Sequence, residues 1–259
     1  MKLNLKTIVG GLAGLAVLLI GGFALWFFVI REDGPEEVST AGALDALDKA
    51  SATATAAATG TSAATAAASP TAAATNAAAA SPGVNGTWTV DNSVQSFVGY
   101  RVKEELANIG GVTAVGRTAA VKGTVTIAAN KATAGTITAD MAQLKSNESF
   151  RDGQLRNQGI EYGKFPTSEF KLTGPVDLPA SVESGETVKV TLKGELTLHG
   201  VTKAVEVPTE VTLKGGVLVV VGQIPILFAD YAIAKPTAPR VVGMEDNGVM
   251  ELQLFFKKS

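Results

Sequence analysis

The feature that most constrains the fold is an alternation of apolar and polar residues with a period of two. It is clearest over residues 188–198, VKVTLKGELTL, where Val, Leu and Gly alternate with Lys, Thr and Glu without a phase error. A period of two places successive side chains on opposite faces of an extended chain. The pattern therefore predicts a β-strand with one buried face.

The same alternation recurs in several further runs between residue 97 and the end of the chain. Asn130-Lys131 and Gly215-Gly216 separate neighbouring runs and predict tight hairpin turns. Only residues 146–162 break the pattern, and their polar sequence predicts a short helix or two turns. Outside the run at 188–198, the side chains predicted to share the buried face include Val98, Tyr100, Val102, Val121, Val125, Ile127, Ile137, Ala139, Met141, Val205, Val207, Val211, Leu213, Met250, Leu252, Leu254 and Phe256.

The predicted domain is all-β and spans residues 86–259. Eight or so antiparallel strands with one short helical segment are typical of an up-and-down barrel or of a sandwich. A barrel is favoured, because long strands joined by hairpins would otherwise leave exposed edges. We therefore expect a lipocalin-like, eight-stranded antiparallel barrel.

A different organisation is predicted for residues 1–31. Residues 7–30 form an uncharged run of 24 residues that, as a helix, would span roughly 36 Å, enough to cross a bilayer core. Lys2 and Lys6 precede the run, which predicts a single-pass membrane anchor with a cytoplasmic N-terminus and an extracytoplasmic C-terminal domain. The alternative is a cleaved signal peptide, although the run is long for one and the small-residue triplet at 41–43 lies far downstream.

Residues 32–85 are predicted to be a low-complexity linker. Between residues 50 and 80 the chain contains 18 Ala and 7 Thr, with no apolar stripe that could dock a helix. This composition predicts a largely disordered tether between the anchor and the barrel. Fully extended, residues 39–87 would reach on the order of 150 Å.

Composition excludes several kinds of site. The chain has no Cys, so it can form no disulfide, thiolate nucleophile or Cys-ligated zinc site, and His199 is its only histidine. Residues 86–259 carry 18 basic and 18 acidic side chains, which argues against a nucleic-acid partner. Arg151-Asp152 is the most enzyme-like pair, but it is better explained as a device that starts and pins a short helix. A lone His199 in a hairpin turn is expected to be exposed or locally bonded, so we predict no catalytic residue, metal or cofactor.

Several motifs resemble the YceI-like family. They are WTVD at the start of the predicted domain, FRDGQLRN followed by KFPTSEF, GELTLHGVTKAV, and FADYAI, at residues 88–91, 150–157, 164–170, 194–205 and 228–233. The resemblance implies a lipocalin-like barrel in an extracytoplasmic domain that binds isoprenoid-type lipids. Two departures from the family pattern concern the ligand more than the fold: Glu104 stands where the family often has His, and residues 105–117 form a longer insertion than usual.

The predicted function follows from the volume inside the barrel. Small inward side chains leave room along the axis, and an apolar lumen takes an apolar chain at about 0.8 kcal/mol per buried CH₂. We therefore expect a lipid such as a polyprenyl chain to bind there, held near the membrane by residues 7–30. The alternative is a ligand-free interaction module with a packed barrel. The residues expected to contact the ligand are Val98, Tyr100, Val102, Val125, Ile127, Ile137, Ala139, Met141, Phe170, Leu172, Val190, Leu192, Leu196, Val207, Leu252 and Leu254.

Overall fold

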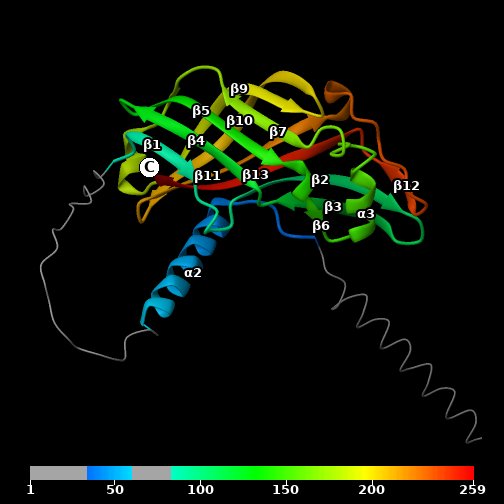
Figure 1. The fold of residues 1–259 in the computed structure, drawn as a ribbon, viewed down its shortest axis with the longest axis horizontal. Helices are drawn as coiled ribbons and strands as arrows, with labels where there is room; N and C mark the ends of the chain where they lie inside the picture. Colours follow the sequence, from blue (N-terminus) through cyan, green and yellow to red (C-terminus); the bar gives the residue numbers. More distant parts are fainter. Residues whose placement is uncertain (1–33, 60–82) are drawn as a thin grey trace, which may run out of the picture. The chain divides into compact units, whose positions relative to one another are not determined.

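A computed structural model describes residues 34–59 and 83–259 of the chain (Figure 1). The predicted anchor at residues 7–30 lies outside the described residues. Within the described ranges, no helix combines the length and the apolar character that crossing a membrane requires. The elements are α2 (Thr40–Thr59), β1 (Gly86–Val90), β2 (Phe97–Leu106), β3 (Gly110–Thr118), β4 (Val121–Ala128), β5 (Lys131–Asp140), η2 (Met141–Gln143), β6 (Lys145–Ser146), α3 (Ser149–Leu155), β7 (Thr167–Leu172), β8 (Val176–Asp177), η3 (Ala180–Ser184), β9 (Val188–Leu198), β10 (Val201–Lys214), β11 (Val217–Leu227), η4 (Phe228–Tyr231), β12 (Val241–Met244) and β13 (Asn247–Lys258).

The predicted barrel is confirmed, and it is closed. Antiparallel pairing runs from β1 through β4, β5, β7, β9, β10 and β11 to β13, and β13 pairs back onto β1. The first half of β13 pairs with β2 instead, which in turn pairs with β3, so β1–β2 and β3–β4 each act as one long bent strand. Closure leaves eight strand positions and no free edge around the ring.

The strands follow the predicted alternation closely. In β9, Val188, Val190 and Leu196 are buried while the Lys, Thr and Glu residues between them lie on the outside. The turn after β10 is formed by Gly215 and Gly216, both at positive φ, as the sequence predicts. The turn before β5 lies one residue earlier than predicted, at Ala129-Asn130.

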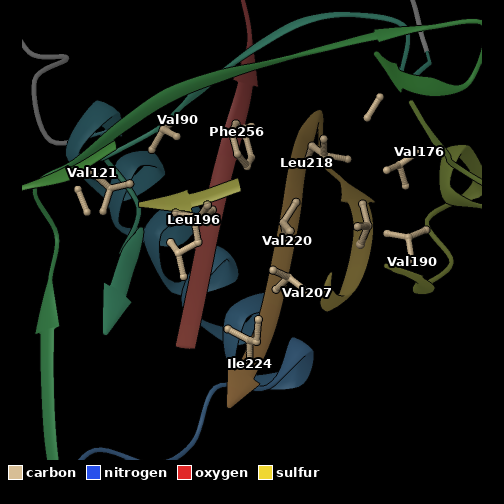
Figure 2. Packing of buried hydrophobic residues seen from close by; sticks show 14 of the residues in the cluster. Val90, Val121, Val176, Val190, Leu196, Val207, Leu218, Val220, Ile224 and Phe256 are labelled. Atoms are coloured by element: carbon tan, nitrogen blue, oxygen red, sulfur yellow. The ribbon is translucent and has the colours of Figure 1, made fainter. Parts of the chain in front are cut away.

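The core lies inside the ring. It contains inward side chains from every strand position and closes most tightly at the end where β1 and η3 lie, around Val84, Trp88 and Val182. The Trp88 indole Nε1 donates a hydrogen bond to the Val84 carbonyl at 2.7 Å, so the ring's one polar atom is satisfied. Figure 2 shows Leu218, Val220 and Ile224 along β11, and Leu218 is the register partner of Phe256 on the neighbouring β13.

Helix α2 is an element that the linker prediction at residues 32–85 did not anticipate. Ser39 caps its N-terminus by accepting a hydrogen bond from the Gly42 amide, and Ala43 and Leu47, one turn apart, are buried on one face. They pack on a second cluster outside the barrel, formed by Val219, Val221 and Phe255. Among the α2 side chains that the structure describes, up to Thr53, Leu47 is the last buried one.

Polar contacts fix the start of α2 to the barrel. The Thr40 hydroxyl donates to Glu210 at 2.5 Å, and the Lys214 ammonium donates to Asp48 at 2.7 Å. Just before the helix, the Arg117 guanidinium donates to the Glu36 carbonyl at 2.6 Å. Residues 36–48 are therefore part of the barrel domain rather than of a solvated tether.

Candidate functional site: an apolar lumen with one polar end

The barrel encloses a cavity. Its volume is about 230 Å³. Its wall is apolar or glycine apart from Tyr100, Glu104, Thr124, Arg151, Ser168 and Glu251. The packed-barrel alternative requires this space to be filled by side chains, and it is not.

The predicted ligand contacts coincide closely with the wall of the cavity. All of them lie on it except Val190, which belongs to the surrounding core. The agreement follows from the strict alternation of β9 and β13 and from the correct phase assigned to β2, β5 and β7. The structure places these side chains on the cavity wall. Their contact with a ligand stays a prediction.

Several wall residues were missed. Leu218, Val220, Ile224 and Ile226 of β11 line the cavity, but β11 is apolar on both faces, so alternation could not identify its inner side. Other missed residues come from the segments that cover the α3 end of the barrel, where the sequence shows no alternation of apolar and polar residues. These are Leu144, Leu155, Ile160, Phe228, Ile233, Pro236 and Met244.

The α3 end of the lumen carries its ionisable groups. Arg151, on α3, lies on the wall, and its Nη2 contacts the Glu104 carboxylate of β2 at 3.0 Å. The Glu104 side chain is 6 % exposed and that of Arg151 is 18 % exposed, so the pair is largely withdrawn from water. Arg151 thus pins α3 across the end of the barrel, as the helix-pinning interpretation predicts.

Asp152 completes the explanation of the Arg-Asp pair. Its Oδ1 accepts hydrogen bonds from the Ser146 amide at 2.9 Å and from the Ser146 hydroxyl at 2.7 Å. A carboxylate in the first turn of α3 also complements the helix dipole. The predicted helix-start role of Asp152 is therefore confirmed by these contacts.

Tyr100 lies beside this charged pair. Its ring faces Gly116 across the β2–β3 pairing, where a Cβ atom on residue 116 would come within 2.4 Å of the ring. Burial raises the pKa of Tyr100 well above its usual range, Arg151 opposes the shift, and Glu104 adds to it. The phenol is therefore a hydrogen-bond donor throughout the physiological pH range.

Glu251 belongs to a different network, although it is counted on the wall. Alternation along β13 directs its carboxylate outward, where it contacts Arg101 at 2.9 Å and Arg117 at 2.7 Å. The Arg117 guanidinium also stacks on Phe97, 4.2 Å from the ring centre. This cluster stabilises the outside of the barrel beneath residues 36–38 and does not enter the lumen.

His199 is not where the sequence places it. It is only 9 % exposed, with Nδ1 2.9 Å from the Tyr231 carbonyl and Nε2 2.9 Å from Glu161 Oε2. Its backbone adopts the left-handed conformation, which turns the ring over the strand end onto Phe165. The expectation of an exposed or locally bonded histidine is wrong, because the side chain ties together two segments more than 30 residues away.

The longer insertion at residues 105–117 forms paired strands and not an irregular loop. Most of it extends β2 and β3 as a regular antiparallel pair, from Leu106 opposite Gly110 to Gly99 opposite Arg117. The acidic pair at its start points apart, with Glu104 buried and Glu105 exposed, as expected for neighbours in a strand. In the described part of the chain, no three His, Asp or Glu side chains lie where they could share a metal ion.

Together, the closed antiparallel ring and its apolar cavity define a hollow β-barrel of the general lipocalin-like type. Residues 88–256 match the family model of the YceI-like domain, and the chain belongs to the YceI-like family. No curated protein matches the chain.

Two solved structures resemble the fold. A polyisoprenoid-binding domain from Saccharophagus degradans, implicated in plant cell wall breakdown, aligns with a TM-score of 0.51 and 16 % identity, covering 66 % of this chain and 98 % of that one. BcnA from Burkholderia cenocepacia aligns with a TM-score of 0.50 and 18 % identity, covering 64 % of this chain and 98 % of its own. At such identities, the similarity supports the barrel fold.

Proposed function

We propose that this protein binds a long apolar lipid, such as a polyprenyl chain, in the lumen of its barrel. The observation that carries the proposal is the cavity itself, whose wall is almost entirely aliphatic or aromatic. An apolar space of this kind gains little from water and favours hydrocarbon. The polyisoprenoid-binding description of the Saccharophagus degradans domain supports the same ligand class.

We propose binding rather than catalysis as the role of the lumen. The charged side chains that enter it are occupied in one pair, Glu104 with Arg151, which also holds α3 in place. His199 lies away from the cavity wall and bonds to Glu161 and Tyr231. These contacts account for the enzyme-like residues as structural elements.

The lipid proposal is tested by extracting purified full-length protein with organic solvent and profiling the extract by mass spectrometry. Leu192→Trp adds bulk to the lumen, and Thr191→Trp adds the same bulk to the exposed neighbouring position of β9. We expect an apolar lipid from the wild type and from Thr191→Trp, reduced at least about tenfold in Leu192→Trp, since the indole occupies the ligand's space. Equal recovery from all three proteins would show that the lipid is not held in the lumen.

We further propose that residues 7–30 anchor the protein in the cytoplasmic membrane, with the barrel on the extracytoplasmic side. The length of the uncharged run and the two preceding lysines support this orientation. Protease added to intact cells should cut the chain between residue 31 and Glu36 and release the barrel together with α2, while an N-terminal tag stays protected. A barrel that is released by protease only after the cells are lysed would contradict the orientation.

A further inference from the structure

Among the described residues, two side-chain polar atoms are buried without any hydrogen-bond partner: the hydroxyls of Tyr100 and Tyr231. They differ in one respect. Tyr100 lies on the wall of the lumen, whereas Tyr231 does not. A buried hydroxyl without a partner costs free energy, so an unpartnered donor at a binding cavity suggests that a ligand atom completes it.

The ring of Tyr100 is placed with little freedom. Gly116 lies directly opposite on β3, and a methyl group at that position would overlap the Tyr100 ring and approach its hydroxyl to 3.0 Å. On the other side, Met250 of β13 is the register partner of Tyr100. The hydroxyl is therefore held at the α3 end of the lumen, close to Arg151 and Glu104.

The charges around the hydroxyl decide what kind of group it can receive. The Arg151 guanidinium is already paired with Glu104, and Asp152 stands next to it in α3. The formal charges of these three groups are one positive and two negative. A carboxylate or phosphate brought here would lie among carboxylates in an environment that screens charge weakly, which is unfavourable.

We propose that Tyr100 is the subsite for the polar end of the ligand, donating a hydrogen bond to an uncharged oxygen, such as the carbonyl of a ketone, quinone, ester or amide. The proposal rests on the function proposed above and names the class of lipid: one with a long apolar tail and a neutral, hydrogen-bond-accepting head. Tail burial supplies the affinity, and Tyr100 fixes which end of the chain lies beside α3.

The test uses three probes with thirteen carbons each: tridecane, tridecan-2-one and tridecanoate. Each displaces a neutral fluorescent probe, N-phenyl-1-naphthylamine, from delipidated full-length protein. Tyr100→Phe removes only the hydroxyl, and Tyr231→Phe removes the other unpartnered hydroxyl, away from the cavity wall.

We expect Tyr100→Phe to lower the affinity for tridecan-2-one by about 5-fold to 10-fold, the usual contribution of one hydrogen bond. The affinity for tridecane should stay within about twofold of the wild-type value. Tyr231→Phe should change neither. Infrared spectra of isotopically labelled ketone should show a carbonyl stretch lowered on binding, and Tyr100→Phe should abolish that shift. Tridecanoate should bind more weakly than the ketone. Glu104→Gln should raise the affinity for tridecanoate, because it removes a negative charge beside the subsite.

Three results overturn the inference. If tridecane binds but Tyr100→Phe leaves both the ketone affinity and its carbonyl stretch unchanged, the hydroxyl is not a subsite, although the lumen still takes apolar chains. If tridecanoate binds more tightly than the ketone to the wild type, the subsite prefers an anion. If none of the three probes displaces the dye from the wild type, the proposed function fails together with the inference.

Discussion

The inner and outer faces of β11 and β13 are both apolar, but they are packed in opposite ways. On the inside, Leu218, Val220 and Leu254 border an open cavity. On the outside, Val219 and Phe255 are covered by α2 to 1 % exposure or less. Exclusion from solvent and close packing are thus separate properties, and in this barrel part of the tightest packing lies outside the ring.

The sharpest way to break this comparison is to truncate one side chain on each face of β13. Phe255→Ala should lower the free energy of unfolding by about 3–5 kcal/mol, because it leaves a void under α2. Leu252→Ala enlarges a cavity that already exists, so we expect a loss below about 2 kcal/mol. Urea denaturation of both variants measures the difference, and equal losses would show that the two faces are packed alike.

The attachment of α2 can be tested separately. Leu47→Asp puts a charge under the helix, so α2 should detach, with a loss of about 2 kcal/mol from the apolar contact. Tryptic cleavage after Lys49 should accelerate at least about tenfold, because a detached segment is accessible to the protease. Ala41→Asp, on the exposed side of α2, is the control. Cleavage that is equally fast in the wild type would contradict stable docking.

Enlarging side chains offers a smaller but more discriminating comparison. Val219→Trp inserts bulk into a packed interface and should cost about 1–3 kcal/mol. Ile137→Trp places its ring in the open lumen, so its unfolding free energy should stay within about 1 kcal/mol of the wild type. Chemical denaturation measures both values, and a large loss in Ile137→Trp would indicate that the lumen is not available space.

The smallest effect expected concerns pH and the segments that close the α3 end. Hydrogen bonds from Lys164 and then His199 lower the pKa of Glu161. A lowered carboxyl pKa stabilises the fold above the ordinary carboxyl range, and this contribution is lost as the pH falls through the lowered pKa. The urea midpoint of Glu161→Gln should therefore lie below that of the wild type at pH 7, and the difference should vanish in acid. A difference that persists at pH 2 would assign the effect to packing.

The sequence predicts best where one residue's position depends on its neighbours in the same strand. In β9, charged residues alternate with Val and Leu, so the inner face was assigned correctly, with Val190 displaced only from the wall into the core. In β11, Val219 and Val221 are as apolar as the residues between them, and the helix that covers them lies about 170 residues away in the chain. The alternation of residues within β11 therefore could not predict its contact with α2.

The arrangement of polar side chains at the α3 end of the lumen could not be predicted from the sequence for a similar reason. Tyr100 was predicted as a wall residue, and Arg151 as a pin, but their proximity depends on how β2 and α3 meet in three dimensions. His199 shows the same limit, since Glu161 and Tyr231 come to it from distant segments. Such convergences follow from tertiary packing, which a single sequence leaves unspecified.

The docking of residues 36–48 decides which part of the chain connects the barrel to the residues before Glu36. Because this stretch is held on the barrel by Arg117, Glu210 and Lys214, the described residues on either side of residues 60–82 belong to the same unit. Their length therefore belongs to a connection within one unit of the chain. An insertion or deletion there changes a connection within that unit, whereas one extra residue immediately before Glu36 lengthens the connection between the barrel unit and the residues that precede it.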